Sequence, residues 1–196
     1  MAQVLHQMSL LVSGNLLRNR YVAKQVVWKA FPDHDGEARR FIYRMREDEE
    51  HYPKAIVDIR SAWQPDASQV EAPVVDQFSI EPDFREGLYA FRVDACPTRW
   101  SYENGKRRIV IRDYDGQIEW LRRQTQPIGK LMSARVTNTE EISSTKEKRV
   151  NVRMVFATFQ GFIDVTNPDA LFDAYGNGIG RGRAWGAGML SVRPCA

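Results

Sequence analysis

One order of predicted secondary structure occurs twice along the chain, and it limits the fold more than any other feature of the sequence. In the first half, an apolar strand precedes an amphipathic helix, two strands with alternating apolar residues, a weak second helix or loop, and a short strand. These elements are predicted at residues 4–12, 21–31, 41–46, 55–62, 66–75 and 77–80. The first half therefore forms one complete β-α-β-β unit that ends in a short strand.

The second half begins after a linker at 81–87 that contains Pro82 and Gly87. Its elements are predicted at residues 88–95, 106–111, 113–125, 131–139, 150–165, 168–175 and 189–193. Their order matches the split βαβ motif, in which helices cover one face of a four-stranded antiparallel sheet. We therefore predict an α+β protein with two tandem ferredoxin-like (RRM-like, βαββαβ) domains at 1–83 and 87–196.

The composition agrees with a folded chain of this size. A length of 196 residues suits two small domains or one large one, and 43% hydrophobic residues exclude global disorder. No apolar run approaches the ~18 residues of a membrane span, and residues 1–16 lack the features of a signal peptide. Two cysteines and three scattered histidines show no disulfide scaffold or metal-ligand spacing. We expect a cytoplasmic protein without a membrane partner, metal or cofactor.

Positive charge is concentrated in the second half of the chain. Residues 1–96 carry 12 basic and 15 acidic side chains, whereas residues 97–196 carry 16 and 10. The basic clusters are Lys106, Arg107 and Arg108; Lys146, Lys148 and Arg149; and Arg181 with Arg183. Such clusters indicate a polyanionic partner, because neutralised phosphates provide most of the sequence-independent affinity for nucleic acid. A solvated surface is the alternative interpretation.

A glycine-rich run at residues 176–191 contains six of the 13 glycines. It has neither the lysine of a P-loop nor the G-x-G-x-x-G spacing of a dinucleotide-binding turn, so nucleotide-cofactor chemistry is not predicted. Glycines allow positive φ and close approach of the backbone to a ligand. The expected phosphate contacts are Gly178, Gly180, Arg181, Gly182 and Arg183. A tight connection between a helix and the last strand is the alternative.

The glycine-rich run carries the sequence G-I-G-R-G-R-A-W-G-A-G-M-L-S at residues 178–191. This sequence closely resembles the C-terminal signature of CRISPR-associated RNA-processing endoribonucleases, in the CasE branch that works in the Cascade complex. Segments 20–32, 88–99 and 159–171 resemble, in the same order, the first helix, the mid-chain strand and the strand-helix step of that family. The resemblance implies two ferredoxin-like domains, which agrees with the predicted order of elements.

The resemblance also implies a function. Such proteins cleave precursor CRISPR RNA at the base of its repeat hairpin without metal and remain bound as a subunit of a CRISPR effector complex, here of type I-E or type IV. The implied partners are the CRISPR RNA repeat hairpin and the other subunits of that complex. The reaction needs a base for the 2′-OH, an acid for the 5′-oxygen and a cation for the phosphate. The alternatives are a catalytically inactive hairpin-binding subunit and a structural subunit whose basic patches face proteins.

The first helix departs from the family at one position. The family commonly carries Y-x-x-H-x-x-x-W there, and this chain has Tyr21, Lys24 and Trp28. A lysine is protonated at neutral pH, so it can stabilise phosphate charge or donate a proton but is a poor base. Arg20 and Tyr21 lie on the same helical face as Lys24, and we predict these three as the catalytic residues. His6 on the first strand is a further candidate.

An RNA stem is expected to be recognised by shape and backbone charge, because A-form RNA hides its base edges in a deep groove. A polar hairpin at 140–149 is predicted to enter that groove with its three cations, and the cluster at 106–108 extends the basic track. Trp100 is expected to stack on bases, and Trp120 to pack in the core.

Overall fold

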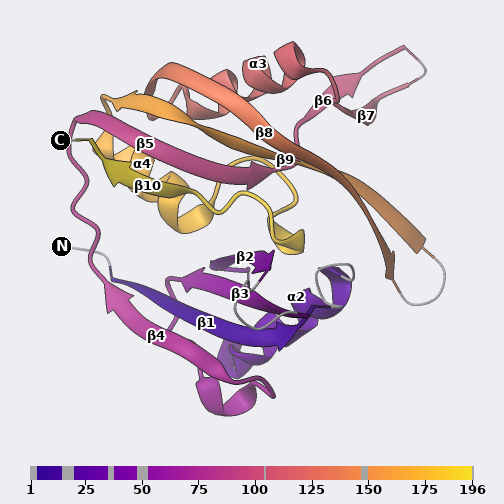
Figure 1. Cartoon of the computed structure of the whole chain (residues 1–196), viewed down its shortest axis with the longest axis vertical. Coiled ribbons are helices and arrows are strands. Elements are labelled where there is room, and N and C mark those ends of the chain that lie inside the picture. Colours follow the sequence, from indigo (N-terminus) through magenta and orange to yellow (C-terminus); the bar gives the residue numbers. More distant parts are fainter. Residues whose placement is uncertain are drawn as a thin grey trace. The chain divides into compact units, whose positions relative to one another are not determined.

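The computed structural model (Figure 1) describes residues 4–14, 20–34, 38–47, 53–103, 105–146 and 150–195. The chain forms two compact units. The first contains Met1–Asp83, Ser143–Val152 and Arg183–Gly186, and the second contains Phe84–Ile142, Arg153–Gly182 and Ala187–Ala196. Within the described ranges, no helix is long and apolar enough to cross a membrane.

The first unit is a four-stranded antiparallel sheet with one helix against it. Its elements are β1 (Leu5–Ser13), α2 (Arg20–Lys29), β2 (Phe41–Glu47), β3 (Lys54–Ser61) and β4 (Val74–Ile80). The strand order is β2-β3-β1-β4, and neighbouring strands are antiparallel. The segment predicted as a weak second helix or loop contains a single 3-10 turn, η2 (Ala67–Gln69), which Asp66 caps by accepting a hydrogen bond from the Ser68 backbone N–H.

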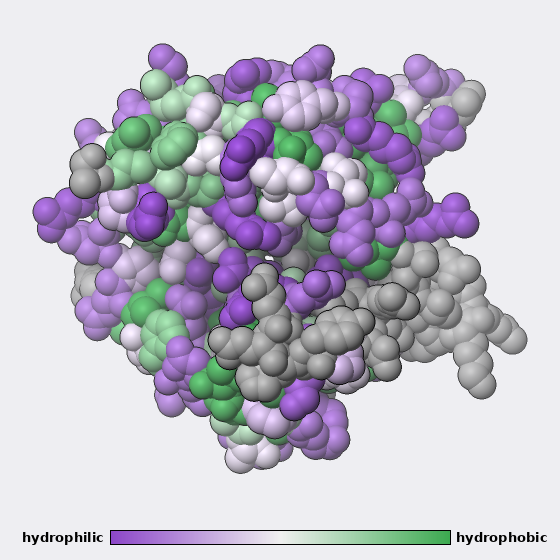
Figure 2. Space-filling model, in the orientation of Figure 1, coloured by the Kyte–Doolittle hydropathy of each residue, from purple (hydrophilic) through white to green (hydrophobic). Residues whose placement is uncertain are grey.

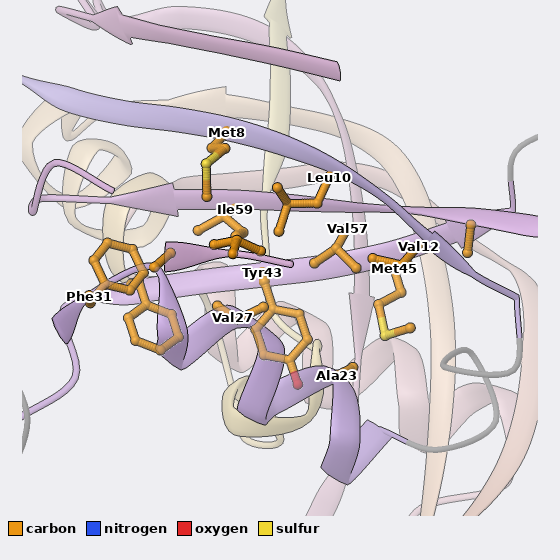
Figure 3. Packing of buried hydrophobic residues seen from close by; sticks show 14 of the residues in the cluster. Met8, Leu10, Val12, Ala23, Val27, Phe31, Tyr43, Met45, Val57 and Ile59 are labelled. Atoms are coloured by element: carbon orange, nitrogen blue, oxygen red, sulfur yellow. The ribbon is translucent and has the colours of Figure 1, made fainter. Parts of the chain in front are cut away.

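The apolar core of the first unit fills the space between α2 and the sheet. Figure 3 shows Met8 of β1, Tyr43 of β2 and Val57 of β3 directed toward the helix. Ala23 and Val27 of α2 are completely buried, and their spacing of four residues places them on one helical face. The helix is therefore fixed in rotation by this face, which also fixes where the polar residues of its first turn lie.

The second unit has the same sheet order with two helices. Its elements are β5 (Gly87–Ala95), β6 (Thr98–Ser101), β7 (Arg107–Val110), α3 (Tyr114–Thr125), β8 (Gly129–Lys146), β9 (Val150–Val165), α4 (Pro168–Asn177) and β10 (Ser191–Pro194). The four-stranded sheet has the order β10-β5-β9-β8. Trp120 and Leu121 of α3 and Leu171 of α4 pack with Phe91 and Phe159 of the sheet, so both helices cover the same face.

Two strands of the second unit differ clearly from the sequence-based prediction. Strand β6 was not predicted, and it pairs with β7 as a separate two-stranded hairpin. Strand β8 continues to Lys146, beyond the predicted end at 139, because main-chain pairing with β9 does not depend on apolar side chains. The predicted fold class, an α+β protein with two tandem ferredoxin-like folds, is confirmed.

On the face shown in Figure 2, hydrophilic residues are spread among smaller groups of hydrophobic ones.

Candidate functional site

The N-terminal end of α2 carries the three residues predicted to be catalytic. Arg20 is the first residue of the helix and is only 7% exposed, whereas Tyr21 and Lys24 are half-buried. Lys24 follows Arg20 by about one helical turn, and it lies at the edge of the buried face that holds Ala23 and Val27. The helix thus presents two cations and a phenol within its first five residues.

The glycine-rich run contributes a second segment to the same unit. Its 3-10 turn η3 (Arg183–Trp185) contacts α2 and β2. The rings of Tyr21 and Trp185 lie 6.3 Å apart at an interplanar angle of 41°, and the Tyr43 hydroxyl donates a hydrogen bond of 3.0 Å to the Ala184 carbonyl. These contacts bring Arg183 to the site of Arg20 and Tyr21. From the sequence, α2 was predicted to be catalytic and the glycine-rich run was predicted to contact phosphate, as two separate segments.

Gly186 allows this close approach. Its φ is +85°, and a Cβ added there would lie 3.1 Å from Arg20 Nη1 and 3.1 Å from Tyr43 Cε2. A side chain at this position would therefore push both groups away and would also strain the backbone. The position requires glycine for the contact between the loop and the residues of α2 and β2.

Positive charge is crowded around the buried phenol of Tyr43. Burial raises the pKa of Tyr43, and the nearby Arg20 and Arg39 guanidinium groups oppose this rise only in part. Burial, followed by the charge of Arg183, lowers the pKa of Arg39. The buried Nη1 of Arg39 has no hydrogen-bond partner in the described part of the chain. A phosphate placed here would supply acceptors and relieve the repulsion between the arginines.

Arg39 and Tyr43 were not identified from the sequence. Arg39 lies in a polar stretch just before β2, where a cation is typical of a solvated turn. Tyr43 alternates with other apolar residues of β2 and is typical of a core position. The available signal was the pair of adjacent basic residues at 39 and 40, next to a strand that follows the candidate helix.

The three glycines that were predicted to contact phosphate have packing roles in the second unit. Gly178 ends α4 with φ +74° and donates its N–H to the Ala174 carbonyl at 2.8 Å. A Cβ on Gly180 would lie 2.6 Å from the Trp120 ring, and one on Gly182 would lie 2.7 Å from Cys96 Sγ. Both residues have positive φ. The tight-connection interpretation accounts for these glycines, and their contact with phosphate remains a prediction, as does that of Arg181, which forms a β-bridge with Cys96.

The hairpin β6–β7 gathers aromatic and basic side chains. Trp100 is 44% exposed, and its ring centroid lies 5.0 Å from Lys106 Nζ and 4.1 Å from Arg108 Cζ. Arg107 is also exposed. Cations held against an exposed indole form a surface that suits both the faces of bases and phosphates. Trp120, in contrast, is buried as predicted.

Other predicted site residues are placed differently. His6 lies on β1, where its Nδ1 is 2.9 Å from Ser79 Oγ on β4. Lys148, Arg149 and the side chain of Lys146 lie outside the described part of the chain. Among the described residues, no group of three or more His, Cys, Asp or Glu side chains is arranged to hold a metal ion.

The protein is thus of a class with two ferredoxin-like folds. A helix and a glycine-rich loop form its cationic site. The sequence pattern of the CRISPR associated protein family matches residues 4–194, and the chain belongs to this family. The resemblance found in the glycine-rich run is thereby confirmed.

Individual CRISPR proteins are also similar to this chain in sequence and in structure. The chain is 27% identical over 195 residues to the CRISPR system Cascade subunit CasE of Escherichia coli K12, covering 90% of this chain and 93% of that protein. Its structure is similar to the CRISPR endoribonuclease Cse3 bound to a 19 nt RNA, with a TM-score of 0.83, 22% identity and coverage of 99% and 100%. It is also similar to Cas6e of E. coli K-12, with a TM-score of 0.73, 22% identity and coverage of 97% and 100%.

Proposed function

We propose that this protein binds the repeat hairpin of precursor CRISPR RNA, cleaves it at the base of the hairpin without a metal ion, and remains bound as a subunit of a CRISPR effector complex. The similarity to the Cascade subunit CasE and to RNA-bound Cse3 supports this role. A chain within a CRISPR RNA-guided surveillance complex has the same fold, with a TM-score of 0.74 at 18% identity over 97% of this chain and 100% of that one. The complex would be of type I-E or type IV, in the cytoplasm.

The arginine cluster around Tyr43 is the observation that carries the proposal. In the proposed reaction, the 2′-oxygen attacks the adjacent phosphorus and the bond from phosphorus to the 5′-oxygen breaks. The products are a 2′,3′-cyclic phosphate and a 5′-hydroxyl. Negative charge rises on the phosphate in the transition state, and Arg20, Arg39 and Arg183 are the groups that would stabilise it. Their mutual repulsion in the free protein is offset when the phosphate binds.

The half-buried residues of α2 would move the protons. Lys24, as an ammonium, donates a proton to the departing 5′-oxygen and regains it from solvent. Tyr21, held against Trp185, orients the 2′-OH, whose proton passes to solvent. A site without a strong base is slow, but a protein that keeps its product needs about one turnover for each RNA.

The stem would be bound by the basic hairpins of the chain. The β6–β7 hairpin presents Trp100, Lys106, Arg107 and Arg108, and a stem read by shape and backbone charge needs such a surface. Lys146, Lys148 and Arg149 remain proposed contacts of the segment between β8 and β9.

A catalytically inactive hairpin-binding subunit is the second candidate. Lys24 favours it, because this lysine stands where the family pattern resembled by α2 commonly has a histidine, which is a better base at neutral pH. In that case the arginine cluster would bind the phosphate without activating it.

Incubation of the purified protein with its cognate repeat RNA in EDTA separates these candidates. Cleavage that leaves a cyclic phosphate supports the endoribonuclease, and tight binding without cleavage supports the second candidate. Absence of both would point to a structural subunit. A matched RNA with a 2′-deoxy sugar at the scissile position should bind equally and remain intact, because the attacking oxygen is missing.

A further inference from the structure

The helix-free face of the second sheet presents arginines and an exposed aromatic ring. Side chains alternate between the two faces of a strand. On β5 and β9, Phe91 and Phe159 pack in the core with α3 and α4. Arg92 and Phe162, at odd offsets from them, therefore project from the opposite face. Both are exposed, and the exposed fraction of Phe162 is 44%.

Strand register places these side chains in two adjoining rows. Phe162 lies opposite Ala90, and Ala90 lies opposite Arg193 of β10. In the next row, Gln160 lies opposite Arg92. One face of the Phe162 ring therefore has a methyl group as its cross-strand neighbour, which leaves room for a flat ligand beside it.

The rows line an open hollow of about 710 Å³, which is within the usual size of ligand sites. Small residues contribute to its lining, including Ala90, Ser133, Gly161 and Ser191. The charged lining residues are Arg92, Arg135 and Arg193, and none of the described residues that line the hollow is acidic. Arg135 donates a hydrogen bond of 3.3 Å to Gln160 Oε1, which orients its guanidinium over the sheet.

We propose that this hollow binds a single-stranded stretch of RNA, with one base stacked on Phe162 and its phosphates bound by Arg92, Arg135 and Arg193. The proposal rests on the proposed function, which makes the single strand the repeat sequence that flanks the hairpin. Stacking on an aromatic side chain next to cations is how single strands are bound without strict sequence preference. An apolar protein segment would instead bury three guanidinium groups without counter-charges, which is costly.

The test compares the affinities of two RNAs for the parent protein and for two variants. One RNA is the hairpin alone, and the other is the hairpin with its single-stranded flank. Phe162→Ala should weaken binding of the extended RNA by about 5- to 100-fold, the effect of losing one stacked base, and should leave the hairpin within twofold of the parent. Tyr114→Ala, which removes a 53% exposed aromatic ring from α3, is the matched control and should change neither affinity.

The arginines are tested by salt dependence. Replacing Arg92 and Arg135 with Ala should reduce the log-log salt slope for the extended RNA by about one to two units, since each single-strand phosphate contact contributes roughly 0.7. An equal loss for both RNAs would overturn the proposal, because the hollow would then belong to the hairpin site. Unchanged RNA affinities together with failed subunit assembly would also overturn it in favour of a protein-docking surface.

The single-strand site can be tested even if the proposed function is wrong. If the parent protein binds no repeat hairpin, an unstructured oligonucleotide with the sequence of the flank still tests the hollow. Binding of that oligonucleotide that is lost in Phe162→Ala would support the single-strand site, and binding unaffected by the substitution would refute it.

Discussion

The Tyr43 hydroxyl donates a hydrogen bond to the Ala184 carbonyl, and the two residues are 141 positions apart in the sequence. The bond joins β2 to the turn that carries Arg183. Because burial raises the pKa of Tyr43, the hydroxyl remains protonated and can donate across the physiological pH range. Tyr43 therefore acts on the proposed site as a positioning residue, through the turn it holds.

Removing this hydrogen bond should affect catalysis more than folding. In Tyr43→Phe, we expect the unfolding free energy to fall by about 1 kcal/mol and the single-turnover cleavage rate to fall by about 10- to 100-fold, because Arg183 loses its fixed position. Tyr89→Phe is the matched control, since its hydroxyl accepts a hydrogen bond of 3.1 Å from the Arg85 N–H in the other unit. It should lose similar stability and keep the parental rate. Equal rates in the two variants would contradict the role of Tyr43.

Lys24 is the proposed proton donor. Lys24→Ala should slow single-turnover cleavage by about 10²–10⁴-fold, the usual contribution of a positioned acid or base, with RNA affinity within about tenfold of the parent. Lys24→His should keep or raise the rate, because imidazole serves as acid or base near neutral pH. A lysine that only binds phosphate would instead lose affinity in the alanine variant with little change in rate. An alanine variant that cuts at the parental rate would end the proposal for Lys24.

Alanine substitutions at Gly180 and Gly105 distinguish the cost of backbone strain from the cost of overpacking. Both have positive φ, but a Cβ on Gly105 meets nothing within 4 Å, whereas one on Gly180 would collide with Trp120. Gly105→Ala should cost about 1–2 kcal/mol of unfolding free energy, and Gly180→Ala a further ~1–3 kcal/mol from overpacking. Chemical denaturation measures both. Equal losses would show that the loop moves away from Trp120 without cost.

Asp58 should make the first unit sensitive to acid. Burial alone would raise its pKa, but hydrogen bonds from Arg44 and Arg46, at 2.9 and 3.1 Å, and from Ser9 outweigh burial and lower it. The folded pKa lies below the unfolded one, so this stabilisation is present above about pH 4. It is lost as the pH falls through the folded pKa.

The variant Asp58→Asn tests this dependence. At pH 7 it should be less stable than the parent, because Arg44 and Arg46 lose their anion. The difference in unfolding free energy should shrink steadily below about pH 4, where the parent also loses its carboxylate. A difference that stays constant between pH 7 and pH 3 would show that the ion pairs do not contribute.

The β6–β7 hairpin should account for much of the salt dependence of RNA binding. Changing Lys106, Arg107 and Arg108 to Glu should lower hairpin-RNA affinity and reduce the log-log salt slope by about two to three units. The same change at three exposed cations outside the proposed RNA surface, Arg122, Arg123 and Lys130, alters net charge equally and should have a smaller effect. Similar slopes in the two variants would mean that total charge, and not this hairpin, governs binding.

The order of elements could be predicted because periodicity is a local property. Phe41, Tyr43 and Met45 alternate in the sequence, and all three are buried. Strand β6 escaped prediction because four residues with two exposed side chains contain too little alternation. The packing of Arg183–Gly186 with the first unit could not be predicted, since it depends on contacts with α2 and β2 that no local sequence pattern contains.

The candidate site was predictable only in parts. Spacing and resemblance identified Tyr21, Lys24 and the glycine-rich run, but they did not place Arg183 beside the helix. Arg39 was not predicted as a site residue, because a basic residue just before a strand is common on protein surfaces. The packing of Gly180 against Trp120 could not be predicted, because it required the position of α3 to be known. The contact of Gly180 with RNA stays a prediction.

The membership of Arg183–Gly186 in the first unit has a consequence for the timing of synthesis. A ribosome releases the chain from its N-terminus, so β1 to β4 and α2 emerge well before Ala184. Until that residue leaves the exit tunnel, the Tyr43 hydroxyl has no loop carbonyl to bind, and only Arg20 and Arg39 of the three arginines are present. A nascent chain therefore cannot assemble the proposed site before Ala184 has left the exit tunnel.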